Sequence, residues 1–214
     1  TRLAILGATG AVGTTLLRVL EERSFPLEEL RLLASERSAG RHVPYAGRDL
    51  TVQAVGPGSF EGIDIAIFSA GADRSREWAP QAVASGAIVI DNSSAFRMDP
   101  DVPLVVADVN PHAAHGHSGV IANPNCSTMQ LVPVLSVLHA RSPLEHVTVS
   151  TYQSVSGTGQ KAIDALRAES AAVLAGEEPP AGVYAQRIAF NVLPFAGSLS
   201  GDDGYTDEEL KLVN

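Results

Sequence analysis

The chain contains a single cysteine, Cys126, in the stretch NPNCSTMQLVPVLSVLH. Proline disfavours a helical residue before it, and Asn125 is a good N-cap, so we expect Cys126 in the first turn of a helix. The dipole and unpaired N–H groups there stabilise a thiolate, the nucleophilic form of cysteine. The same N–H groups can stabilise an oxyanion on a substrate bound to sulfur. A small buried, inert thiol is the alternative interpretation.

A glycine-rich loop, GATGAVG, follows the first apolar run and opens the first helical pattern. Glycines at this spacing permit a tight turn and a close approach of the backbone to a ligand. The N-terminus of the following helix then offers N–H groups to a pyrophosphate. A turn needed only for close packing is the alternative. The residues expected to contact a dinucleotide are Gly7, Thr9, Gly10, Ala11, Val12 and Gly13.

The choice between NAD and NADP is made at the end of the second strand, where an acidic residue suits the ribose 2′-hydroxyl and an arginine suits a 2′-phosphate. The sequence there is LLASERSAG. Ser35, Arg37 and Ser38 can all bond a phosphate, and Arg37 supplies positive charge. We therefore favour NADP, with Glu36 directed to solvent. The alternative for Arg37 is an exposed loop arginine with no ligand.

The elements that position these residues alternate between strands and helices. Apolar runs predict strands over residues 2–8, 29–35, 51–55, 63–70 and 87–94. Helical patterns occupy residues 11–23 and 73–86. The order of strand, helix and strand indicates an α/β fold in which helices cover both faces of a parallel sheet. We predict a Rossmann-type, doubly wound domain over residues 1–123.

The pattern changes in the second part of the chain, residues 124–214. A long strand is predicted over residues 145–155, and an amphipathic helix with a glycine stop over residues 159–176. A last helix is predicted after Thr206, an N-cap followed by acidic residues. Because this helix is the final element, we expect the sequence to be a fragment of an α+β domain whose C-terminal part is missing.

Composition limits the classes of function. The 214 residues carry a formal net charge of −9, which argues against broad nucleic-acid binding. No apolar run reaches the roughly 18 residues of a membrane span. One cysteine and no visible signal peptide favour the cytoplasm. The histidines of HAAHGH, which are His112, His115 and His117, form a poor metal pattern, and we predict no metal.

Four motifs occur in order along the chain: GATGAVG, DNSSAFR, NPNCST and YQSVSGTG. Together they resemble the aspartate-β-semialdehyde dehydrogenase family. The resemblance implies a homodimeric oxidoreductase that reduces L-aspartyl-4-phosphate with NADPH, through a cysteine thioester, to aspartate semialdehyde and phosphate. It places the protein in the biosynthesis of lysine, threonine, methionine and isoleucine.

The resemblance also implies roles for individual residues. Cys126 is the nucleophile, Gln153 orients the substrate, and Asn125 is an oxyanion donor. Arg97, with Asn92 of the same motif, binds the phosphoryl group, a task that suits the guanidinium fork. Ser156 and Gly157 contact the cofactor near its nicotinamide. The alternatives are a surface position for Gln153 and a pairing of Arg97 with Asp99 or Asp101.

The family's histidine base and substrate-binding arginine match no residue of this chain, so we expect them in a later segment. Two alternatives for function stay open. One is N-acetyl-γ-glutamyl-phosphate reductase, whose cysteine motif usually reads NPGCY, whereas this chain has NPNCS. The other is a non-catalytic module that binds NADP.

Overall fold

Six strands form one parallel sheet in the computed structural model, which describes residues 1–194, 196–201 and 204–213. The strands are β1 (Arg2–Leu6), β2 (Glu29–Ala34), β5 (Gln53–Ala54), β6 (Ile65–Phe68), β7 (Ile88–Asp91) and β8 (Val120–Ala122). Their order is β5-β2-β1-β6-β7-β8, and all neighbours run parallel. The chain thus winds outward from β1 in both directions, as the predicted doubly wound fold requires.

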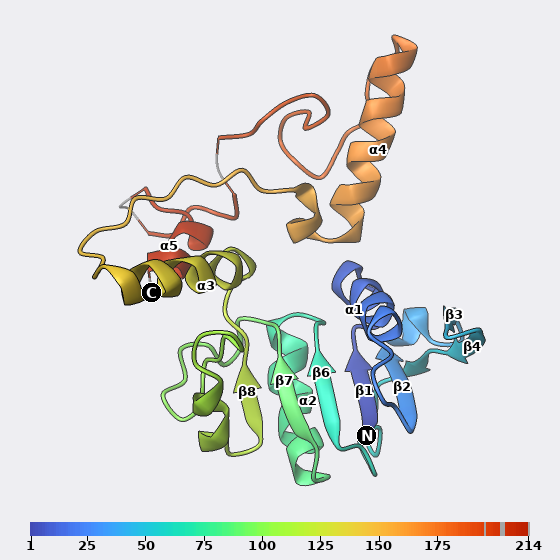
Figure 1. Cartoon of the computed structure of the whole chain (residues 1–214). Helices are drawn as coiled ribbons and strands as arrows, with labels where there is room; N and C mark the ends of the chain where they lie inside the picture. The colour runs from blue at the N-terminus through green and yellow to red at the C-terminus, as the bar shows by residue number, and fades with distance from the viewer. Residues whose placement is uncertain (195, 202–203, 214) are drawn as a thin grey trace. The chain divides into compact units, whose positions relative to one another are not determined.

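Helices cover both faces of this sheet (Figure 1). The helices of the chain are α1 (Ala11–Glu22), α2 (Ala72–Ala84), α3 (Cys126–Arg141), α4 (Gln160–Ala175) and α5 (Asp207–Val213). Ile5 of β1 lies in one buried cluster with Leu17 of α1, and the next residue, Leu6, lies in another with Trp78 of α2. This alternation explains why β1 is apolar on both sides.

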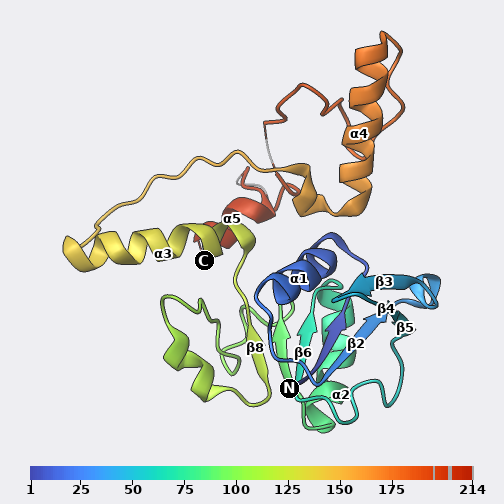
Figure 2. The same cartoon turned by 45° about the vertical axis from the view of Figure 1, so that its right-hand side comes forward.

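The carboxyl ends of the parallel strands share one edge of the sheet (Figure 2). Five segments leave the sheet there: residues 7–10, 35–38, 69–71, 92–97 and 123–125. Open α/β sheets bind their ligands at this edge, beside the point where the strand order reverses. The strands predicted over residues 2–8, 29–35, 63–70 and 87–94, and the helices predicted within residues 1–141, are confirmed with small changes in their ends.

An antiparallel hairpin, β3 (His42–Tyr45) and β4 (Arg48–Thr51), was not predicted. Its two-residue turn is Ala46 and Gly47, which have φ angles of 49° and 75°. Two positive φ angles give a turn whose twist matches that of the strands. The sequence run 51–55, predicted as one strand, is divided between the end of β4 and the short strand β5.

The chain divides into two compact units, Thr1–Leu144 and Glu145–Asn214. The strand predicted over residues 145–155 is wrong: residues 146–154 pair with no strand in the described part of the chain, and a turn of 3-10 helix, η3 (Val155–Thr158), follows. The helices α4 and α5 confirm the other two predictions. The side chain of Thr206 accepts a hydrogen bond from the backbone N of Glu209 at 3.2 Å, as expected of an N-cap.

Glu169 of α4 organises the second unit. Its side chain is buried, with 2% exposure, and one carboxylate oxygen accepts hydrogen bonds from the backbone N of Ile188 at 2.8 Å and of Ala189 at 3.0 Å. A buried carboxylate is tolerated where such donors replace water. These two bonds hold a chain segment without regular structure against α4.

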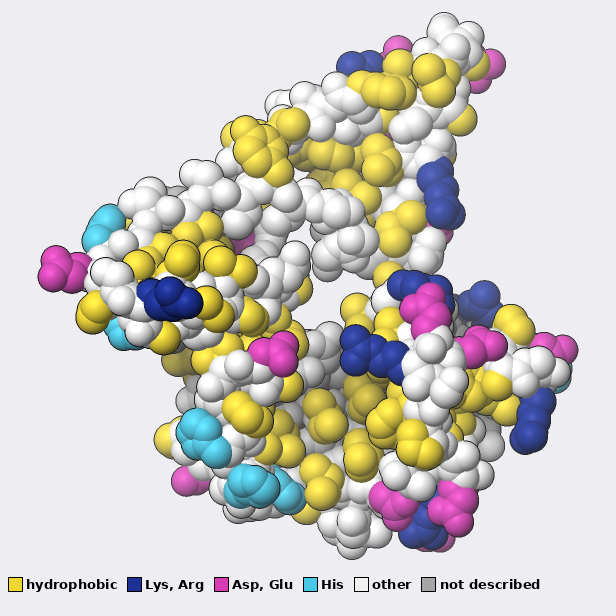
Figure 3. All heavy atoms as spheres, in the orientation of Figure 1, with side chains coloured by type: hydrophobic (Ala, Val, Ile, Leu, Met, Phe, Trp, Pro, Cys, Tyr) yellow, Lys and Arg dark blue, Asp and Glu magenta, His cyan; other side chains and the backbone are white. Residues whose placement is uncertain are grey.

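The helix α3 has no fully buried residue among those described. Hydrophobic side chains gather on its surface (Figure 3), including Val134, Val137 and Leu138, which are 58%, 65% and 51% exposed.

No helix in the described ranges is long and apolar enough to cross a membrane.

Candidate functional site

The glycine loop after β1 is packed too closely for side chains. Gly7 has a φ of +94°, and a Cβ placed on it would lie 2.5 Å from the carbonyl oxygen of Ser69. A Cβ on Gly13 would lie 2.3 Å from the carbonyl oxygen of Gly7. The backbone N of Gly7 also donates to the carbonyl of Leu33 at 2.9 Å. These contacts draw the loop against the ends of the neighbouring strands β2 and β6.

The N-terminus of α1 is available to an anion. Its N-cap is Gly10, so among the described residues no side chain caps the helix, and no acidic residue lies in its first turn. Thr9 and Ala11 are partly exposed, and Val12 is 48% exposed. An uncapped helix start on a glycine loop fits a pyrophosphate, because the first N–H groups of a helix have no partner within it.

The end of β2 carries the residues predicted to select the cofactor. The 3-10 turn η1 (Glu36–Ser38) begins directly after this strand, with Ser35 as its N-cap. Ser35, Glu36 and Arg37 are exposed, whereas Ser38 is buried at 9% exposure. The positive charge of Arg37 therefore lies on the surface at the carboxyl edge of the sheet.

Cys126 is the first residue of α3 and is exposed, as the N-cap pattern predicted. The side-chain oxygen of Asn125 accepts hydrogen bonds from the backbone N of Ser127 at 2.9 Å and of Thr128 at 3.3 Å. Asn125 itself is buried, with 6% exposure. Because α3 follows β8, the thiol lies at the carboxyl edge of the same sheet as the glycine loop. The interpretation of Cys126 as a buried thiol does not agree with this position.

The DNSSAFR loop follows β7 at this edge. Nε of Arg97 donates to the carbonyl oxygen of Asn123 at 2.8 Å, and its Nη2 donates to that of Asn92 at 3.2 Å. The guanidinium is partly buried. Arg97 thus joins its own loop to the segment that leads into Cys126, a structural contact that the sequence did not predict.

The remaining predicted residues belong to the second unit. Gln153 does not stand in a strand as predicted. Its Nε2 donates to Oε1 of Glu208 at 3.0 Å. Ser156 and Gly157 form part of η3, where the backbone N of each bonds to Ser154, at 3.3 Å in both cases.

An ion cluster at the start of α5 was missed by the sequence reasoning, although its spacing was visible. Nζ of Lys211 lies 2.7 Å from Oδ2 of Asp207 and 3.1 Å from Oε2 of Glu208. Partial burial opposes the charge of Lys211, but hydrogen bonds to the two carboxylates leave its pKa raised. The hydrogen bond from Lys211 is the main reason why the pKa of Asp207 is lowered.

The histidines do not gather into a site. His112 and His115 lie in the 3-10 segment η2 (Pro111–Gly116), and Nδ1 of His117 accepts a hydrogen bond from the backbone N of Gly119 at 3.0 Å. Across the described ranges, no group of three or more His, Cys, Asp or Glu side chains is arranged to hold a metal.

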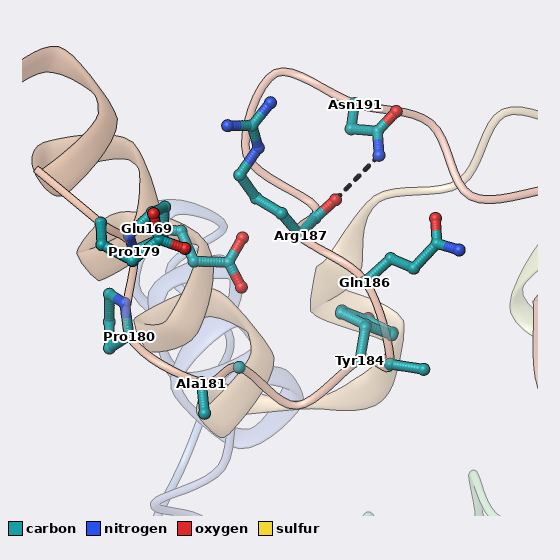
Figure 4. Close-up of a pocket in the computed structure, with 11 residues that line it drawn as sticks. Glu169, Pro179, Pro180, Ala181, Tyr184, Gln186, Arg187 and Asn191 are labelled. Atoms are coloured by element: carbon teal, nitrogen blue, oxygen red, sulfur yellow. Dashed lines mark hydrogen bonds between the residues drawn. The ribbon is translucent and has the colours of Figure 1, made fainter. Parts of the chain in front are cut away.

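A pocket of about 540 Å³ lies between α4 and the segment 178–191 of the second unit (Figure 4). The carboxylate of Glu169 and the side chain of Arg187 lie beside it, and Nδ2 of Asn191 donates to the carbonyl of Arg187 at 2.9 Å. The described residues that line this pocket include none of the predicted site residues. Gln153 lines a different, more open hollow with Phe190.

Two family models match the chain. The semialdehyde dehydrogenase NAD-binding domain matches residues 2–117, and the semialdehyde dehydrogenase dimerisation domain matches residues 135–214. The predicted boundary near residue 123 falls between these matches and stays a prediction. The Rossmann-type fold followed by a second, dimerisation domain is confirmed.

Relatives and solved structures agree with these models. The aspartate-semialdehyde dehydrogenase of Aquifex aeolicus is 52% identical, over 99% of this chain and 63% of the relative. The crystal structure of aspartate semialdehyde dehydrogenase II from Vibrio cholerae, complexed with ASA, matches with a TM-score of 0.94 at 46% identity, over 99% of this chain and 63% of that one. A Candida albicans aspartate semialdehyde dehydrogenase solved with NADP matches with a TM-score of 0.55 at 29% identity, over 67% and 48% of the two chains.

The chain therefore spans about 63% of the length of the first of these relatives. Its sequence similarity covers both units, from the glycine loop to the last helix. On this evidence, the chain belongs to the aspartate-semialdehyde dehydrogenase family.

Proposed function

We propose that this chain supplies the cofactor site and the nucleophile of an NADP-dependent enzyme that converts L-aspartyl-4-phosphate reversibly to L-aspartate 4-semialdehyde and phosphate. The observation that carries the proposal is the position of Cys126. It is exposed, it begins a capped helix, and it lies at the sheet edge that also carries the glycine loop. The 52% identity to the aspartate-semialdehyde dehydrogenase of Aquifex aeolicus supports the choice of substrate.

The phosphates of the cofactor are held by residues of the first unit. The uncapped start of α1 and the glycine loop accept the pyrophosphate. Ser35 and Arg37 face solvent at the end of β2, where a 2′-phosphate requires donors and positive charge. This charge supports NADP over NAD, and the Candida albicans relative was solved with NADP. When bound, the nicotinamide supplies or accepts a hydride.

The thiolate of Cys126 carries the acyl group. In the reductive direction, sulfur forms a bond to the acyl carbon, and the bond from this carbon to the phosphate oxygen breaks. Inorganic phosphate leaves and a thioester remains. After hydride reaches the acyl carbon, the carbon–sulfur bond breaks, which releases the aldehyde and regenerates the thiolate. The backbone N–H of Cys126 and the side-chain amide nitrogen of Asn125 stabilise the oxyanion that forms on this carbon, since the N–H groups of Ser127 and Thr128 donate to the capping oxygen of Asn125.

The remaining residues position the substrate in this proposal. Arg97 and Asn92 lie on the loop after β7 and bind the phosphoryl group through polar and charged donors. Gln153 orients the substrate carbon chain, and Ser156 and Gly157 contact the cofactor near its nicotinamide. The dimerisation-domain match supports a homodimer as the working assembly.

An enzyme assay tests this proposal. NADP, phosphate and aspartate semialdehyde are supplied to the protein, and the formation of NADPH is measured. We expect turnover from the protein that includes the later segment with the histidine base and substrate-binding arginine, and we expect Cys126→Ser to abolish it. The 214 residues alone should bind NADP without turnover. Arg37→Ala should weaken NADP binding but not NAD binding.

Two results would contradict the proposal. A preference for N-acetylglutamate semialdehyde would identify the related reductase. Binding of NADP without turnover, together with a Cys126 thiol that is inert to alkylation until denaturation, would identify a non-catalytic module.

A further inference from the structure

Asp91 is a fully buried carboxylate at the carboxyl end of β7, with 0% exposure. One of its oxygens accepts a hydrogen bond from Oγ of Ser75 at 2.5 Å, and the other accepts one from Oγ of Ser93 at 2.7 Å. Burying a carboxylate is costly unless such donors replace water. The proposed reaction assigns no step to this group, so its retention in the core calls for another role.

The two serines belong to different parts of the fold. Ser75 is a buried residue of α2, the helix that covers one face of the sheet. Ser93 lies in the DNSSAFR loop, and its Oγ also accepts a hydrogen bond from the backbone N of Ala95 at 3.0 Å. The contact of Asp91 with Ser93 therefore fixes the path of the loop, whereas its contact with Ser75 ties the strand end to a helix.

The loop is joined in turn to the segment that carries the cysteine. The carbonyl oxygen of Asp91 accepts a hydrogen bond from the backbone N of Asn123 at 2.8 Å. On the other side, the carbonyl oxygen of Asn123 accepts the bond from Nε of Arg97 at 2.8 Å. Both the backbone N–H and the carbonyl group of Asn123 are therefore hydrogen-bonded, the first to Asp91 at the start of the loop and the second to Arg97 at its end.

Only two residues separate Asn123 from Cys126, and both are buried. Pro124 has a fixed φ, and Asn125 is locked by its two capping hydrogen bonds. A shift of Asn123 is therefore passed on to the sulfur with little freedom to absorb it. Displacements of about 1 Å in a reacting group can lower a rate about a hundredfold.

We infer that Ser93, anchored by the carboxylate of Asp91, is a positioning residue for Cys126. It does not touch the substrate in the proposed reaction. It holds the loop that clamps Asn123 and so sets where α3 begins. The inference rests on the proposed function of Cys126 as the nucleophile.

The two serines provide a matched pair for the test, because each donates one hydroxyl to the same buried carboxylate. Ser93→Ala and Ser75→Ala are compared in the whole protein for kcat, KM and thermal stability. Both variants should lose stability. We expect Ser93→Ala to lower kcat by about 10- to 100-fold with little change in KM for NADP. Ser75→Ala should keep kcat within about twofold of the wild type, since it leaves the loop bonds intact.

A second measurement does not require turnover. The backbone amide NMR shifts of residues 125–128 and the alkylation rate of Cys126 by iodoacetamide should change in Ser93→Ala and stay near wild type in Ser75→Ala. Equal effects of the two variants on these signals, or no effect of Ser93→Ala, would overturn the inference. If the wild type shows no turnover but the signals differ as expected, the proposed function fails and the positioning of Cys126 by Ser93 stands.

Discussion

Replacing Gly13 by alanine tests the packing of the glycine loop. The new Cβ would lie 2.3 Å from the carbonyl oxygen of Gly7, and 2.7 and 2.8 Å from Cα and the carbonyl carbon of Ala8. The shortest of these separations falls about 1.1 Å short of the 3.4 Å at which ordinary van der Waals contact begins. All three neighbours are backbone atoms, which cannot rotate away, so α1 must move outward from the loop.

Two opposing effects set the change in the free energy of unfolding that Gly13→Ala causes. Overpacking a close-packed site costs about 1–3 kcal/mol, and we take the upper value because three backbone contacts are involved. Alanine favours a helix by about 1 kcal/mol over glycine. The free energy of unfolding should therefore fall by about 2 kcal/mol, which lowers the melting temperature by about 4–8 °C for a chain of this length.

Gly10 provides the control, because its added Cβ would meet one atom, the carbonyl oxygen of Gly7, at 3.3 Å. Its φ of −82° suits alanine. Gly10→Ala should change stability by less than about 1 kcal/mol, yet it should weaken NADP binding at least about tenfold, since it fills the approach of the pyrophosphate. Urea unfolding and calorimetric titration measure the two quantities. A Gly13→Ala protein that is as stable as the wild type would refute the packing described for this loop.

Two further predictions concern stability. Ala46 has a φ of 49° in the β3–β4 turn, so Ala46→Asn, which gives an Asn-Gly turn with Gly47, should raise the free energy of unfolding by about 1 kcal/mol in urea; an unchanged midpoint would contradict this. The pKa of Asp207 is lowered chiefly by its hydrogen bond from Lys211. The ionised carboxylate therefore stabilises the folded protein fully at pH values above its unfolded pKa of about 3.9. This stabilisation is lost as the pH falls through the lower pKa of the folded state. Urea midpoints should therefore fall less steeply below about pH 4 in Asp207→Asn; equal slopes would show that the pair adds nothing.

Several elements could be predicted because their signals are local. The buried strands β1, β6 and β7 are continuous apolar runs, as expected where helices cover both faces of a sheet. The start of α3 was predicted from the proline before Asn125 and from the capping preference of that residue. These features depend on residues that are neighbours in the sequence, so they can be predicted from the sequence alone.

Other elements depend on contacts between distant residues. A strand was predicted over residues 145–155, but a strand exists only where a partner supplies its hydrogen bonds, and no described segment does so for residues 146–154. Pro44 and an Ala-Gly turn concealed the hairpin β3–β4, because proline is a poor strand residue and Asn-Gly is the commoner turn signal.

The candidate site divides in the same way. Cys126 and the glycine loop were found from the sequence, because each has a short motif. The bonds from Arg97 to Asn123, and from Ser75 and Ser93 to Asp91, were not found. The first two join residues 26 and 16 positions apart, which only the packing of the sheet brings together. The bond between Ser93 and Asp91 joins residues 2 positions apart, but no motif in the sequence marked it.

The segment 146–154 has a practical consequence for handling the chain. Within the described ranges its backbone has no neighbouring strand, and it exposes Val147, Val149 and Tyr152, the last at 89%. Extended segments with open backbone edges and β-branched side chains are templates for intermolecular strand addition. Preparations of the 214 residues should therefore aggregate with increasing concentration, and lysine substitutions in this segment should improve their solubility.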